Sequence, residues 1–181
     1  MAQRDALDVL NRLVATGGIR DYAIAADERA WRDSVSSVRE ATDILVVPAA
    51  SEMAGPDGGL LHLLALLEKD DCCTPGDYSI NVAGWDVCFL MATSELEQEA
   101  VMLAIERELV VEETGRVVRA RILDPAHFAA LMLAWITAQN WLCLADIIGE
   151  EDVDRAELAD IVSRHGMQAK WRKFCVREGI K

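Results

Sequence analysis

The sequence has no long apolar stretch, few aromatic residues and no common signature of a catalytic or nucleotide-binding site. Aromatic residues make up 6% of the 181 positions. Within the weakly charged segment 126–145, the longest apolar stretch has nine residues, too few to span a bilayer. The dinucleotide-binding, Walker A, HExxH, EF-hand and GxSxG patterns are all absent. We therefore expect neither a membrane span nor any of these site types.

Basic residues are also scarce. Eighteen lysines and arginines stand against 31 aspartates and glutamates, which gives a net charge of −13. This balance argues against an overall-basic nucleic-acid surface and against binding to an anionic membrane. The charge is uneven, because residues 168–181 hold five basic residues and one acidic residue. The simplest interpretation of this basic end is a solvated last helix.

Cysteine and histidine show no metal-site spacing. The five cysteines include no CxxC pair, and the three histidines are scattered. Cys88 and Cys143 lie in apolar runs, which predicts small core residues. His62 and His127 lie in apolar helical segments, where we expect satisfied core or edge histidines rather than ligands. The odd number of cysteines favours a reducing compartment. The segment after Met1 is charged and unlike a signal peptide, so we expect a cytoplasmic location.

The hydrophobic pattern predicts an α+β chain that becomes entirely helical after residue 123. Short apolar runs predict strands of one sheet at Tyr22–Ala26, Ile44–Val47 and Val87–Leu90. A capping box at Ser94 and Glu97 predicts a helix running to about Glu106. Later helix starts are expected at Asp124-Pro125, near Asn140 and at Asp154. Further helices are expected at 4–15, 60–67 and 167–177, and a further strand at 117–123.

The order of these segments resembles the minimal nucleotidyltransferase family. These proteins have the polymerase-beta-like fold and are related to bacterial toxin–antitoxin and abortive-infection proteins. The likeness covers most of the chain and is carried by the acid-initiated strand 41–47, by 85–90 followed by 96–100, by 122–128 and by the helical segments between 154 and 174. It implies a mixed sheet flanked by helices over 1–123 and a helical C-terminal subdomain over 124–181, packed on that core.

The resemblance also implies where catalytic acids would lie. In the family, acidic side chains on adjacent strands hold two magnesium ions that bridge a nucleoside triphosphate and activate a hydroxyl. Here Asp43 occupies the first acidic position, Leu45 stands where its partner acid would be, and the third position falls near Cys88 with Asp86 close by. In place of the family's glycine turn stand Asp27 and Glu28, which would repel phosphate.

These departures lead to three functional hypotheses. The first is a degenerate, non-catalytic nucleotidyltransferase-like protein without a cofactor, which binds a protein partner or itself. The second is an active magnesium-dependent nucleotidyltransferase in which Asp43 and Asp86 hold the metal. The third is a non-catalytic nucleotide or small-ligand binder. We also expect Phe128, Leu131, Leu133 and Trp135 to be largely buried, within the subunit or between subunits.

Overall fold

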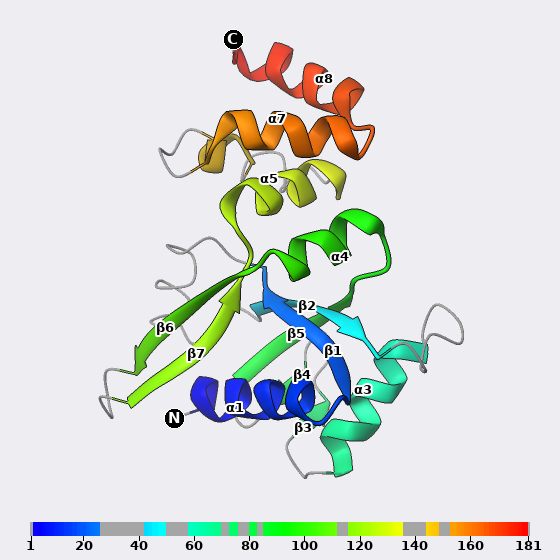
Figure 1. Ribbon diagram of the computed structural model, residues 1–181, viewed down its shortest axis with the longest axis vertical. Coiled ribbons are helices and arrows are strands. Elements are labelled where there is room, and N and C mark those ends of the chain that lie inside the picture. The colour runs from blue at the N-terminus through cyan, green and yellow to red at the C-terminus, as the bar shows by residue number, and fades with distance from the viewer. Residues whose placement is uncertain are drawn as a thin grey trace. The chain divides into compact units, whose positions relative to one another are not determined.

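The structure is a computed structural model, shown in Figure 1, with an α+β fold. It describes residues 2–25, 42–49, 58–69, 73–75, 80–82, 85–111, 116–135, 144–148 and 153–180. The chain divides into two compact units, Met1–Leu123 and Asp124–Lys181. Within the described ranges, no helix has the length and apolar character needed to cross a membrane.

The first unit is built on a mixed sheet. Its described part has seven strands in the order β3-β4-β5-β2-β1-β7-β6. Central strand β2 pairs antiparallel with β1 and parallel with β5, while β1 pairs parallel with β7. The three strands expected in one sheet are thereby confirmed, although Ala26 lies outside the described residues. The strand bounds are β1 Ile19–Ile24, β2 Thr42–Pro48, β3 Cys73–Pro75, β4 Ile80–Val82, β5 Trp85–Met91, β6 Ile105–Val111 and β7 Arg116–Ile122.

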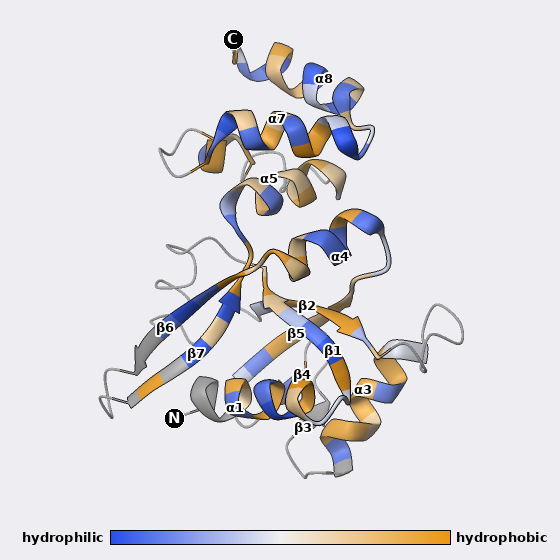
Figure 2. Ribbon diagram, in the orientation of Figure 1, coloured by the Kyte–Doolittle hydropathy of each residue, from blue (hydrophilic) through white to orange (hydrophobic). Residues whose placement is uncertain are grey.

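One face of the sheet carries most of the core of this unit. Helices α1 (Ala2–Ala15) and α3 (Gly58–Lys69) contribute leucines that cluster with Tyr22, Ile44 and Val87. Figure 2 shows how strongly hydrophobic α3 is. Helix α1 ends as predicted at Gly17, whose φ of 74° suits glycine. The sheet residues that alternate with this cluster point to the opposite face, where α4 lies.

Helix α4 (Glu95–Met102) starts as predicted but ends four residues earlier than expected. The capping box between Ser94 and Glu97 is present. The chain leaves the helix after Met102 and enters β6, which pairs antiparallel with β7. Arg121 of β7 donates hydrogen bonds to the carbonyls of Val101 and Met102, at 3.1 and 3.3 Å. Strand pairing between β6 and β7 therefore overrides the local helical pattern between 103 and 106.

The described residues of the second unit are helical, with no strand after Pro125, as predicted. It contains α5 (Pro125–Ala134), α7 (Arg155–Arg164) and α8 (Gln168–Glu178). Asp124 caps α5 and Asp154 caps α7, each by accepting backbone N–H bonds. Figure 2 shows hydrophobic and hydrophilic residues alternating along α7, whose buried residues are Leu158, Ile161 and Val162.

The predicted core of α5 is confirmed for three of its four residues. Phe128, Leu131 and Leu133 are buried, and Leu131 is 0% exposed. Trp135 is only half-buried, because it lies at the helix end where the backbone leaves α5. Residues 144–148 are helical, whereas Cys143 and the start of the helix expected near Asn140 lie outside the described residues.

Replacing Leu131 with alanine should lower the free energy of unfolding by roughly 2–5 kcal/mol, because the side chain is fully buried and its removal leaves a cavity. Denaturant titration followed by far-UV circular dichroism measures the loss. The matched control is Val176→Ala in α8, where the side chain is 79% exposed. That control should change stability by less than about 0.5 kcal/mol. Equal losses in the two variants would contradict the assigned core.

Candidate functional site

Asp43 and Cys88 lie side by side on neighbouring parallel strands. The register of β2 and β5 makes Asp43 the partner of Cys88. Both side chains point away from the face that carries the main core, since Ile44 and Val87 belong to that core. The Cys88 thiol donates a hydrogen bond to the Asp43 carboxylate. Cys88 is half-buried rather than a core residue as predicted, because its strand position faces Asp43.

A second carboxylate does not accompany Asp43 on β2. Leu45, two residues further along, shares its face of the sheet and is 0% exposed. Its partner on β5 is Leu90. The sheet next to Asp43 is therefore apolar where a second acidic ligand would have to stand.

Asp86 lies on the same face of β5 as Cys88 but belongs to a different set of contacts. It is exposed, it is paired with Asn81 of β4, and its Oδ1 accepts a 2.8 Å hydrogen bond from the Asn81 side chain. From the register, Asp86 is a diagonal neighbour of Asp43, with Cα atoms roughly 7–8 Å apart. The structure thus places the two predicted metal ligands on one face of the sheet, with Asp86 hydrogen-bonded to Asn81.

Asp43 is the exposed residue of β2, but its carboxyl group is partly desolvated by the sheet. This burial raises its pKa above the ordinary value of 3.8, and hydrogen bonding with Cys88 offsets part of the rise. Burial, followed by the nearby carboxylate, raises the pKa of the Cys88 thiol as well. The same desolvation thus acts against the charged form of both side chains.

A pocket of about 270 Å³ opens at the other end of the same strands. Arg20, Asp21 and Val47 line it, with Arg121 on one side and α4 residues on the other. Val47 lies four residues beyond Asp43, which is about 13 Å along the strand. An ion pair of 3.2 Å joins Arg121 to Asp21. The Arg121 guanidinium is thus already engaged by a carboxylate, besides its bonds to α4 carbonyls, while Arg20 is a second basic residue of the lining.

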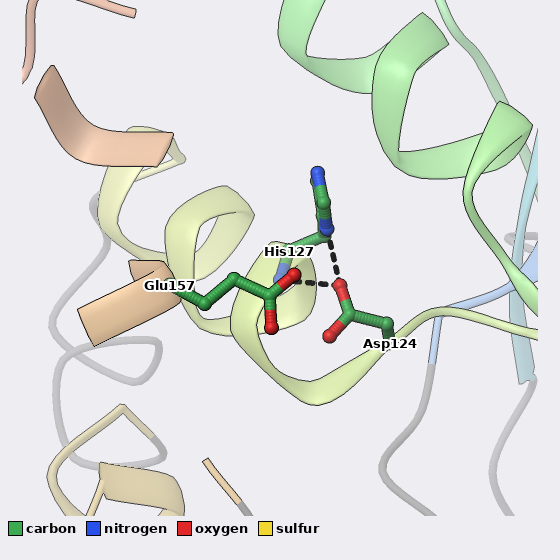
Figure 3. A group of neighbouring side chains, drawn as sticks. All are labelled: Asp124, His127 and Glu157. Atoms are coloured by element: carbon green, nitrogen blue, oxygen red, sulfur yellow. Dashed lines mark hydrogen bonds and ion pairs between the residues drawn. The ribbon is translucent and has the colours of Figure 1, made fainter. Parts of the chain in front are cut away.

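The second unit contains a group of side chains that the sequence analysis did not bring together. Asp124, His127 and Glu157 each offer a ligand atom, and these atoms lie within 4.8 Å of one another (Figure 3). His127 is 1% exposed and its Nδ1 contacts the Asp124 carboxylate. The expectation of a satisfied, buried histidine is confirmed. The contact between Asp124 and His127 could have been predicted, because a helix N-cap residue and a residue of the first turn lie close together. Nothing in the neighbouring sequence predicts that Glu157 joins them.

Comparison with models of known protein families finds no match, and no curated protein matches the chain significantly. The turn at Asp27 and Glu28 lies outside the described residues. The arguments about function therefore rest on the positions of Asp43, Leu45 and Cys88.

The pH dependence of stability should report the environment of Asp43. Because its native pKa is raised, the folded state binds this proton more tightly than the unfolded state does. The contribution of Asp43 to stability should therefore fall as pH rises from about 4 through its native pKa. Asp43→Asn lacks this titrating group. The difference in free energy of unfolding, variant minus wild type, should therefore increase over that pH interval and stay constant above it. Urea titrations of both proteins between pH 3.5 and 8 measure the difference, and a pH-independent difference would contradict a raised pKa.

Proposed function

We propose that this chain is a non-catalytic nucleotidyltransferase-like protein that acts by binding protein surfaces, most simply a second copy of itself. The observation that carries the proposal is the register of β2 and β5, in which Asp43 stands opposite Cys88 and two residues before buried Leu45. A family resemblance in fold does not supply an activity, so the site residues decide.

The donor set at this position is unsuited to two-metal chemistry. Magnesium takes oxygen ligands at about 2.0–2.1 Å in a near-octahedral arrangement, and paired ions need carboxylates that bridge or flank them. The strands carry one carboxyl group, one thiol and one leucine there, and partial burial raises the pKa of the carboxyl group. Asp86 is a diagonal neighbour that already accepts a hydrogen bond from Asn81.

The pocket on the same unit gives little support to a nucleotide-binding role. Its volume of about 270 Å³ falls below the roughly 300–1,000 Å³ of common ligand pockets. Arg121, which could bind phosphate, already pairs with Asp21 and with two backbone carbonyls. A triphosphate would have to displace these bonds.

Surface features of the first unit support an interaction role. In the described part of the chain, β6 pairs only with β7 and forms one edge of the sheet. Next to its start, Met102 and Leu103 are 58% and 56% exposed, although both side chains are large and apolar. Adjacent exposed apolar side chains beside a strand edge are typical of a protein–protein contact.

Purified protein should transfer no nucleotide in the presence of magnesium, because a two-metal site lacks its acids. The assay is incubation with labelled nucleoside triphosphates together with transfer RNA and candidate protein acceptors. Asp43→Asn serves as the paired variant and should be indistinguishable from the wild type. Label incorporation that requires magnesium and disappears in Asp43→Asn would establish an active enzyme and overturn the proposal.

Self-association should depend on the apolar end of α4. The wild-type mass measured by light scattering should rise with protein concentration, and Leu103→Lys should weaken this association about tenfold or more. Lysine at a helix C-terminus is electrostatically acceptable, so folding should be preserved. The matched control is Leu61→Lys on α3, 64% exposed in the same unit, which should associate like the wild type. A chain that stays monomeric at all concentrations would refute self-association.

A further inference from the structure

Three potential metal ligands meet where two helices of the second unit begin. Asp124 is the N-cap of α5, His127 lies in the first turn of α5, and Glu157 lies in the first turn of α7. Figure 3 shows the Glu157 side chain directed from α7 toward the other two. One ligand atom from each residue lies within 4.8 Å of the other two. Residues 30 positions apart thus converge on one point.

The site combines a buried potential ligand, His127, with an exposed one, Glu157. His127 is 1% exposed, so packing holds its ring, and its Nδ1 faces the Asp124 carboxylate. Glu157 is exposed and can shift to complete a coordination sphere. Access for an ion therefore exists on the Glu157 side, while the imidazole position is set by the fold.

The Asp124 carboxylate has lone pairs left over. Its Oδ2 accepts the backbone N–H of His127 at 3.0 Å and contacts the imidazole Nδ1. Its Oδ1 accepts one bond, from the Ala126 N–H at 3.1 Å. Since each carboxylate oxygen has two lone pairs, Oδ1 retains one for a metal.

Helix capping accounts for Asp124 but not for the whole group. Helix α7 has its own N-cap, Asp154, which accepts the N–H bonds of Ala156 and Glu157. The Glu157 carboxylate is not needed for that cap, and it lies close to the carboxylate of Asp124. In the described part of the chain neither of these two carboxylates has a lysine or arginine partner, in contrast to Asp160, which pairs with Arg164. Two neighbouring anions of this kind are stabilised by a cation between them.

We propose that Asp124, His127 and Glu157 bind a divalent transition-metal ion of the zinc type. Binding would release the proton that His127 Nδ1 shares with Asp124, since an imidazole nitrogen ligates a metal only without its proton. That nitrogen and two carboxylate oxygens then form a mixed donor set that suits zinc and its neighbours, whereas magnesium and calcium prefer oxygen alone. Three protein ligands leave a fourth tetrahedral position for water. The ion would link the first turns of α5 and α7. This proposal involves only the second unit and is independent of the function proposed for the first.

The test is direct metal titration of the full-length protein. Zinc binding is measured by calorimetry, and cobalt replaces zinc to report the ligand type through its visible spectrum. Cobalt bound by nitrogen and oxygen lacks the intense thiolate charge-transfer band that cysteine ligands produce. This distinction matters because the chain has five cysteines that could bind zinc elsewhere.

Two variants remove a ligand while sparing the fold. Glu157→Gln alters an exposed side chain, and Asp124→Asn keeps a residue that caps helices as well as aspartate does. Each should weaken the affinity for zinc and cobalt at the thiolate-free site about tenfold or more. Asp160→Asn removes an exposed carboxylate from the same helix α7 and should leave the affinity unchanged. Absence of a thiolate-free site in the wild type, or equal affinities in Glu157→Gln and Asp160→Asn, would overturn the proposal.

Discussion

The structure of the first unit depends on the burial of β2 between β1 and β5. Every residue of this strand is buried except Asp43, which is exposed. A strand covered on both faces must be apolar almost throughout, which is why Ile44–Val47 reads as a continuous hydrophobic run. The same constraint restricts polar chemistry to the start of the strand. Asp43 is the one acidic residue that β2 carries there.

Much of the fold could be predicted because its determinants are local. The run at 44–47, the capping box at Ser94 and the Asp124-Pro125 start each carry their information within a few residues, and the structure contains all three. The end of α4 could not be predicted in this way. It is decided by tertiary contacts, namely the hydrogen bonds from Arg121 to the helix end 20 residues before it and the pairing of β6 with β7 in a hairpin. The helical pattern between 103 and 106 is the weaker influence there.

The candidate site residues likewise differ in whether the local sequence or tertiary contacts determine their surroundings. The resemblance placed the third acidic position near Cys88, and the register of β2 and β5 pairs Cys88 with Asp43. Whether Asp86 could replace the missing acid depended on geometry that the sequence does not contain, and the strands hold it in a separate contact with Asn81. Buried His127 was predicted correctly, but its neighbour Glu157 comes from another helix. No spacing rule connects residues brought together only by helix packing.

Asp43 and Asp124 show how the backbone around an aspartate moves its pKa in either direction. At the start of β2, desolvation by the sheet raises the pKa of Asp43, and the Cys88 thiol offsets part of the rise. At the start of α5, Asp124 is also desolvated, but the His127 side chain and the N–H groups of the helix end donate to it and its pKa falls. The difference follows from the donors that each backbone leaves available, because the N–H groups of a paired strand are used in the ladder while those of a first helical turn are not.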